Sequence, residues 1–269
     1  MAARKRWSPI TPIAISTEDC TPDIKERIIA DLPFLRDLTP AEVREIQPLF
    51  REAGYKPGEQ VFGGQDRTGY VRTDHVRGST TPGGLHPSRE LFVLGAGLIK
   101  VIRGDYDGRE VVLDFLVTGE FFGSAVGIGA EERAEAHTAT CVFYLDDRAV
   151  NRLFTRHPSV PARILDDTAE RIGDLHRRLH LLSGADVPTR IAATLQRLAE
   201  KTGKRTSEGI LLQTPLSREE LASLSGTTTE SASRVVSDLK RRGCIIAGRR
   251  WFTLTEKFSD LIDPDHGLT

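Results

Sequence analysis

The stretch that most constrains this chain is Leu216 to Arg242, LSREELASLSGTTTESASRVVSDLKRR. Ser217, followed three residues later by Glu220, predicts a capping box and a helix that runs to about Leu224. Gly226 ends that helix, and a second apolar run then repeats at helical spacing. The apolar positions of this second run are Ala232, Val235, Val236 and Leu239. We therefore predict two short helices joined by a tight turn.

The outward face of the second helix has a charge pattern suited to DNA. Glu230 and Arg234 stand one turn apart, and such a pair can accept from cytosine and donate a fork to guanine in a major groove. A solvated salt bridge within the helix is the alternative. From Glu230 to Arg250 six basic residues stand against two acidic ones, an excess of +4, whereas the whole chain has a formal charge of -1. This concentration of positive charge favours a nucleic-acid partner.

A second basic element follows directly. Gly243 is succeeded by CIIAGRRWFTL, which predicts two apolar strands around Gly248, Arg249 and Arg250. Such a β-hairpin has cations at its tip, where they can contact phosphates. An ordinary helical hairpin without a DNA-binding role is the alternative for the whole segment.

Taken together, LSREELASLSGTTTESASRVVSDLKRRGCI resembles the winged helix-turn-helix of the CRP/FNR family of bacterial transcription regulators. The E-x-x-S-R of the family's recognition helix stands here as Glu230, Ser233 and Arg234. The resemblance implies double-stranded DNA with a palindromic site, and RNA polymerase, as partners. The DNA-binding residues that we expect are Thr228, Thr229, Glu230, Ser233, Arg234, Ser237, Arg249 and Arg250.

The resemblance also implies a half-site with a TGA-like core. Arg234 would contact the guanine, and Glu230 the cytosine of the opposite strand. Thr229 occupies the position where the cyclic-AMP branch of the family has a second guanine-binding arginine. We therefore expect a half-site closer to TTGA than to GTGA.

Length and composition bound the class of protein. With 269 residues, 39% hydrophobic and 28% charged, the chain is long enough for two globular domains. No apolar run approaches the roughly 18 residues of a membrane span, and the first 20 residues lack the apolar core of a signal peptide. Cys20, Cys141 and Cys244 are widely scattered, which predicts neither a disulfide framework nor a zinc site. We expect a cytoplasmic protein in a reducing compartment.

The chain divides into four segments of different pattern. Residues 1–23 are polar and aperiodic, and we expect a mobile extension. Residues 24–157 combine helices with short strands that favour a β-roll, and a Gly-, Thr- and Pro-rich insertion interrupts them at 63–89. A long helix at 158–183 and a DNA-binding domain at 184–269 follow. The predicted fold is α+β: an N-terminal jelly roll like a cyclic-nucleotide-binding domain, a dimerisation helix and a C-terminal winged helix-turn-helix.

The long helix has a heptad repeat. Apolar residues recur at alternating spacings of three and four, which predicts a seam between two parallel helices. A monomeric amphipathic helix is the alternative, because the repeat is shorter than three to four heptads. The residues of the predicted dimer interface are Leu165, Thr168, Ile172, Leu175, Leu179 and Leu182.

The effector is constrained by one motif. Family members that bind cyclic nucleotides have Gly-Glu-x-x-Gly-Glu and then Arg-Ser, because the phosphate needs an arginine and the ribose a carboxylate. Here Ser124 replaces the second glutamate, and no Arg-Ser pair follows, so cyclic AMP is disfavoured. The candidate effector residues are Gly119, Glu120, Phe122, Gly123, Ser124 and Arg133.

Other cofactors are constrained by the ligands that they need. Three cysteines are too few for an iron-sulfur cluster held by four thiolates, which is therefore disfavoured. Haem stays open, because a single ligand suffices and His75, His86, His137 and Cys141 are candidates. His176 and His180 have metal-ligand spacing, but the two arginines between them oppose a bound cation, so no metal site is expected.

These patterns predict a homodimeric, sequence-specific DNA-binding transcription regulator, controlled through its β-roll by an effector other than cyclic AMP. The alternative is a cyclic-nucleotide-type ligand-binding module that regulates a partner protein. Such a module gives no reason for Glu230, Ser233 and Arg234 to face outward beside a basic hairpin. An enzyme is not expected, since no nucleophile–base or carboxylate constellation is present.

Overall fold

The structure is a computed structural model that describes residues 22–63, 90–104, 110–126, 132–259 and 261. The chain divides into two compact units between Asp174 and Leu175. The expected extension, apart from its last two residues, and the insertion beyond Gly63 lie outside the described residues. None of the described helices is both long and apolar enough to cross a membrane.

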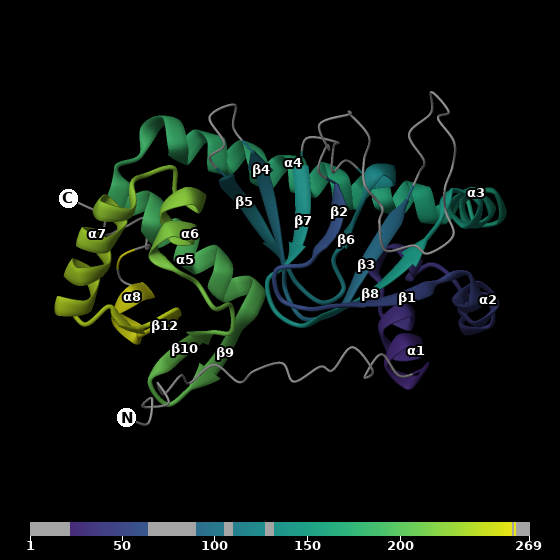
Figure 1. Ribbon diagram of the computed structural model, residues 1–269, viewed down its shortest axis with the longest axis horizontal. Coiled ribbons are helices and arrows are strands. Elements are labelled where there is room, and N and C mark those ends of the chain that lie inside the picture. The colour runs from purple at the N-terminus through teal and green to yellow at the C-terminus, as the bar shows by residue number, and fades with distance from the viewer. Residues whose placement is uncertain (1–21, 64–89, 105–109, 127–131, 260, 262–269) are drawn as a thin grey trace. The chain divides into compact units, whose positions relative to one another are not determined.

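The first unit contains a β-roll made of two four-stranded antiparallel sheets (Figure 1). One sheet has the order β1-β8-β3-β6 and the other β2-β7-β4-β5. The strands are β1 (Arg51–Tyr55), β2 (Gln60–Gly63), β3 (Leu91–Ala96), β4 (Ile99–Gly104), β5 (Glu110–Leu116), β6 (Phe121–Phe122), β7 (Glu132–Ala136) and β8 (Thr140–Leu145). The predicted roll is confirmed, but β1 and β7 were not predicted, because REAGY and ERAEA have the charged, weakly apolar composition of loops.

Strand alternation gives the first sheet two buried faces. On β3, Phe92 and Leu94 point into the interior between the two sheets, whereas Leu91 and Val93 point to the opposite side. Aromatic rings fill the interior: Phe92 stacks on Phe122 with centroids 5.2 Å apart and lies 5.3 Å from Phe62.

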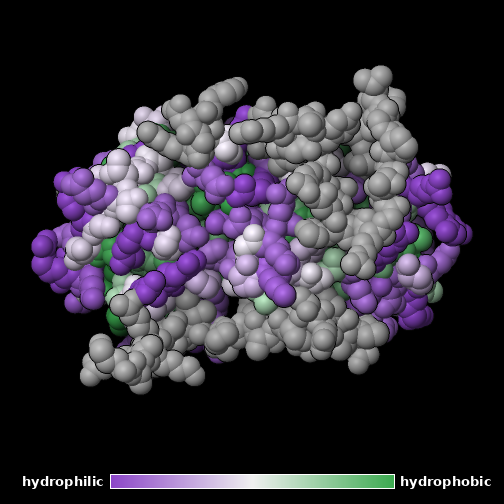
Figure 2. Space-filling model, in the orientation of Figure 1, coloured by the Kyte–Doolittle hydropathy of each residue, from purple (hydrophilic) through white to green (hydrophobic). Residues whose placement is uncertain are grey.

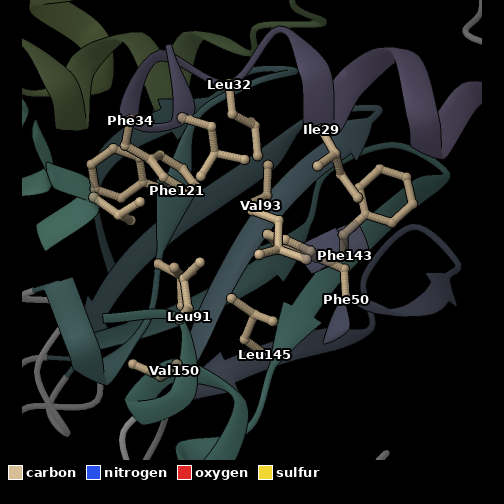
Figure 3. Packing of buried hydrophobic residues seen from close by; sticks show 14 of the residues in the cluster. Ile29, Leu32, Phe34, Phe50, Leu91, Val93, Phe121, Phe143, Leu145 and Val150 are labelled. Carbon is tan, nitrogen blue, oxygen red and sulfur yellow. The ribbon is translucent and has the colours of Figure 1, made fainter. Parts of the chain in front are cut away.

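Helices cover the opposite face of this sheet (Figure 3). They are α1 (Pro22–Ala30), α2 (Pro40–Ile46), α3 (Asp147–Arg156) and the start of α4 (Ser159–Gly184), with 3-10 turns η1 (Pro33–Leu35), η2 (Gln47–Leu49) and η3 (Ser124–Val126). Thr39 and Glu42 form a capping box at the start of α2. Phe34 meets Phe121 edge to face at 5.3 Å, which joins η1 to β6.

The second unit is the winged helix-turn-helix. Its elements are α5 (Val187–Thr202), β9 (Gly203–Thr206), β10 (Gly209–Leu212), α6 (Arg218–Leu224), α7 (Thr229–Arg241), β11 (Ile245–Gly248), β12 (Trp251–Leu254) and α8 (Glu256–Ser259). The four strands form one antiparallel sheet in the order β11-β12-β10-β9. The two predicted helices and the predicted hairpin are therefore confirmed, and the capping box of Ser217 and Glu220 is present.

Two glycines shape the ends of α6 and α7. Gly226, at φ 57°, lets the Thr227 amide donate to the Ala222 carbonyl, which closes the first helix. Gly243, at φ 73°, does the same for α7, where the Cys244 amide donates to the Leu239 carbonyl. Both closures have the Schellman pattern, so the turn and the entry into the hairpin are fixed by backbone hydrogen bonds.

The cysteines depart from expectation. Cys141, buried in β8, is disulfide-bonded, whereas Cys244 is a buried free thiol. The disulfide at Cys141 therefore differs from the reduced cysteines expected in a reducing compartment. Scattered cysteines give no signal of pairing, because distance along the chain does not report distance in space.

Candidate nucleic-acid interface and effector region

The recognition helix α7 presents the predicted base-contacting side chains to solvent. Thr228 caps the helix by accepting a hydrogen bond from the Ser231 amide at 3.2 Å. Arg234 Nη1 lies 3.6 Å from Glu230 Oε1, and these side chains are 70% and 80% exposed. Arg234 Nη2 also donates to Ser231 Oγ at 3.2 Å. Ser231, which was not predicted as a site residue, thus joins the cap to the arginine.

The opposite face of α7 is buried, and this fixes which residues face outward. Ala232, Val236 and Leu239 are buried in the helical packing of the second unit. Thr229 and Ser237 are exposed, and Ser233 is half-buried. Hydrophilic residues predominate over the surface of α7 in Figure 2. The helix therefore has a polar face available to a DNA groove.

The basic residues at the end of α7 are partly neutralised. Arg241 and Arg242 both pair with Asp238, the latter at 3.7 Å. Lys240 is exposed and forms no ion pair within the described part of the chain. The excess of positive charge seen in the sequence is therefore uneven along the helix.

The two arginines at the tip of the β11–β12 hairpin, which we call the wing, are differently engaged. Arg249 is exposed, with no hydrogen bond or ion pair among the described residues. Arg250 donates to the Pro215 carbonyl at 3.3 Å and lies 3.6 Å from the Glu220 carboxylate. The sequence predicts the same role for both arginines, and only the structure shows that their contacts differ.

Arg218, at the start of α6, is a further cation that the sequence did not single out. Its guanidinium lies 4.7 Å from the centroid of the buried Phe252 ring, and burial lowers the pKa of Arg218. This cation–π contact joins α6 to β12. No spacing rule could have found it, because the two residues are 34 positions apart and meet only in the fold.

The predicted seam residues lie along one exposed face of α4. Leu165 is 69% exposed and Leu179 is 61% exposed. In the described part of the chain, six large apolar side chains are exposed, and five of them belong to this seam. Those five are Leu165, Ile172, Leu175, Leu179 and Leu182. An isolated chain leaves this surface in water, which is the usual mark of an interface.

The candidate effector residues in and around the β5–β6 segment make hydrogen bonds or packing contacts with neighbouring residues. Glu120 Oε2 accepts from the Val117 amide at 2.9 Å, and Ser124 Oγ accepts from the Glu90 amide at 2.9 Å. Phe122 is buried in the roll interior. Gly119 and Glu120 also line a cavity of about 710 Å³ beside α1, whose other walls include Ile28, Pro33 and Ala96.

Arg133 lies apart from this group. On β7, Ala134 and Ala136 point into the roll interior, so Arg133 points to the outer face of its sheet. There its guanidinium pairs with Glu110 at 2.7 Å and Glu135 at 3.0 Å. An anion in the roll interior would therefore not meet this guanidinium.

The roll interior contains polar groups that the sequence did not indicate. Glu90 is buried, and burial together with Asp146 raises the pKa of its carboxyl. Burial, followed by the nearby Tyr144, raises the pKa of Tyr55 to about 12. Strand alternation points Glu90 to the same side as Phe92.

The structure describes two of the four candidate haem ligands. His75 and His86 lie outside the described residues. His137 packs against Phe115 with ring centroids 4.8 Å apart, and the disulfide bond of Cys141 removes the thiolate that would bind iron. Cys141 therefore does not fit as a haem ligand in this form of the protein.

Two segments of the chain match known protein families. Residues 189–257 match the Crp-like helix-turn-helix domain, and residues 84–157 match the cyclic nucleotide-binding domain. The transcriptional regulator LdrP of Thermus thermophilus is 32% identical over 171 residues, which cover 61% of this chain and 81% of that protein. The CRP-like cAMP-activated global transcriptional regulator of Mycobacterium tuberculosis is 27% identical over 175 residues, 64% of this chain and 78% of that protein.

A solved structure has the same fold. FixK2 from Bradyrhizobium japonicum aligns with a TM-score of 0.63 at 19% identity, over 79% of this chain and 97% of that one. The similarity to LdrP extends over most of that regulator's length, and the relatives named here are regulators rather than enzymes. The chain belongs to the CRP/FNR family of DNA-binding transcription regulators.

Proposed function

We propose that the protein acts as a homodimer that binds a palindromic DNA site and is controlled through its β-roll by an effector other than cyclic AMP. The observation that carries this proposal is the outward face of α7, where Glu230 and Arg234 are exposed on a helix whose other face is buried. DNA-contacting residues are proposed at the α7 positions expected from the sequence and on the wing, with Ser231 added because it contacts Arg234.

Arg234 is suited to exchange its partner. Its ion pair with Glu230 is solvent-exposed, and exposed pairs contribute about 0–1 kcal/mol. A bidentate contact from an arginine to guanine discriminates against the wrong base by about 1–3 kcal/mol. The ion pair therefore opposes a contact between Arg234 and guanine only weakly, and the exchange frees the Glu230 carboxylate to accept from a cytosine amino group.

The dimer follows from the seam on α4. Leu165, Ile172 and Leu179 recur every seven residues, and Leu175 and Leu182 continue the same face. Pairing two such helices removes these apolar side chains from water. Two α7 helices related by a two-fold axis then match two half-sites one helical turn apart, which accounts for a palindrome.

Control by an effector is proposed on the β-roll. Two features support an effector other than cyclic AMP: Ser124 holds the Glu90 amide, and Arg133 faces away from the roll interior. The segment at Gly119 and Glu120 and its neighbouring cavity are the proposed effector region. RNA polymerase is proposed as a further partner, as for a regulator that acts on transcription.

Selection of binding sites from randomised duplex DNA tests this function. Full-length protein should enrich an inverted repeat with TTGA-like half-sites, and sedimentation of the complex should show two chains on one duplex. Enrichment of unrelated or non-repeated sequences, or one chain per duplex, would contradict the proposal.

A further inference from the structure

The two arginines of the wing differ in every contact that the structure shows. Arg249 is exposed and contacts no polar group among the described residues. Arg250 contacts the start of α6 through both its side chain and its backbone. Its guanidinium meets the Pro215 carbonyl and the Glu220 carboxylate, and its own carbonyl accepts from the Leu216 amide at 3.2 Å.

The backbone at Arg250 adopts a conformation that is strained for a residue other than glycine. Arg250 has φ 62°, and it is the only residue other than glycine with a positive φ in the described part of the chain. The left-handed conformation is strained for a residue with a Cβ, so glycine is the default at such a turn. The Arg250 guanidinium reaches the start of α6, and the contact that it makes there explains why an arginine occupies this strained position.

Glu220 anchors that contact. Its side chain is only 13% exposed, and its Oε2 also accepts from the Ser217 amide at 2.8 Å. One carboxylate therefore serves both the cap of α6 and the wing. Because this carboxylate offsets the charge of Arg250, Arg250 has less net attraction for a phosphate than Arg249.

We propose that Arg250 is a positioning residue that clamps the wing to α6, and that Arg249 is the residue of the wing that contacts a DNA phosphate. This inference rests on the proposed DNA-binding function and divides the wing's role between two adjacent arginines. The clamp holds Arg249 in place before DNA binds.

Salt titrations of DNA binding separate the two roles. Each phosphate contact adds about 0.9 to the slope of log K against log salt, so Arg249→Ala should lower the slope by about two for the two wings of a dimer. Arg250→Ala should weaken binding, but adding it to Arg249→Ala should lower the slope no further. A total loss of about four in the double variant would mean two independent phosphate contacts and would overturn the proposal.

Glu220→Gln is a second variant, for which the two possible roles of Arg250 predict different changes in DNA affinity. Glutamine can keep the capping box but not the ion pair with Arg250. If Arg250 is a clamp, Glu220→Gln should weaken binding as Arg250→Ala does. If Arg250 is instead a phosphate contact, removal of a nearby negative charge should leave binding unchanged or strengthen it, and the proposal fails.

Hydrogen exchange without DNA tests the clamp apart from the DNA-binding function. The amides of Leu216 and of residues 246–252 should exchange several-fold faster in Arg250→Ala and Glu220→Gln, and at the wild-type rate in Arg249→Ala. Equal rates in all four proteins would overturn the clamp. Wild-type protein that binds no selected site would instead contradict the proposed function, while the exchange result would still stand.

Discussion

Arg171 of α4 stacks over the ring of Phe121 and donates to the Phe121 carbonyl. The guanidinium carbon lies 4.3 Å from the ring centroid, and Nη1 lies 2.9 Å from the oxygen. Phe121 stands between Glu120 and Phe122, in the proposed effector region, and Arg171 is next to Ile172 of the seam. One side chain therefore connects the effector region with the proposed dimerisation helix.

Replacing Arg171 with alanine should loosen β6 from α4. The lost cation–π contact and hydrogen bond together are worth about 1–2 kcal/mol, which corresponds to roughly 5–30-fold faster exchange of the amides around Phe121. Arg171→Lys should recover part of the protection, since it restores the charge but not the planar stack. Arg152→Ala, at an exposed position of α3, is the matched control. Unchanged exchange in Arg171→Ala would show that the contact does not couple the two elements.

The seam predicts a stable dimer in solution. Aspartate at Ile172 and Leu179 would place charges between the two helices, and the variant should sediment as a monomer that loses specific DNA binding. His180→Asp introduces one such charge at an exposed position outside the seam and should remain dimeric. Sedimentation velocity at micromolar concentration decides between these outcomes. A monomeric wild-type protein would refute the seam as an interface.

Buried Glu90 predicts a pH dependence of stability. Burial raises the pKa of its carboxyl in the folded state, so its protonated form is favoured by folding. The stabilisation is complete below the unfolded pKa of about 4.3 and is lost as pH rises through the raised folded value. Glu90→Gln should therefore raise the melting temperature at neutral pH, and the gain should vanish towards about pH 4.

Glu52→Gln on β1 provides the control for this measurement, because it makes the same chemical change at an exposed position. Loss of stability in Glu90→Gln at neutral pH would mean that the Glu90 carboxylate is held by favourable contacts.

The DNA-binding half was predictable because its signals are local. Ser217 and Glu220 lie within one helical turn, and the capping box that they form follows from that spacing. Gly226 and Gly243 mark helix ends, because glycine adopts the positive φ that closes a helix. The apolar period of α7 likewise fixes its buried face through residue spacing alone.

The contacts that distinguish similar residues were not predictable, because they join distant segments. Arg249 and Arg250 are adjacent and chemically identical, and only the approach of Pro215 and Glu220 separates them. Arg133 resembled part of an effector motif, but the pairing of β7 places it on the outer side of its sheet. A shift of one residue in a strand reverses that face, and the sequence ERAEA has too little apolar alternation to fix it.

Recognition of a base by Arg234 can be measured through binding to half-sites in which single base pairs are altered. Wild-type protein and Arg234→Ala should be compared on the selected palindrome and on duplexes with the guanine of each half-site replaced. Arg234→Ala should lose about 1–3 kcal/mol of binding free energy per half-site on the selected palindrome. It should also bind the duplexes with and without the guanine equally well. An equal loss on specific and random DNA, with guanine preference intact, would contradict the assignment of Arg234 as the base-contacting residue.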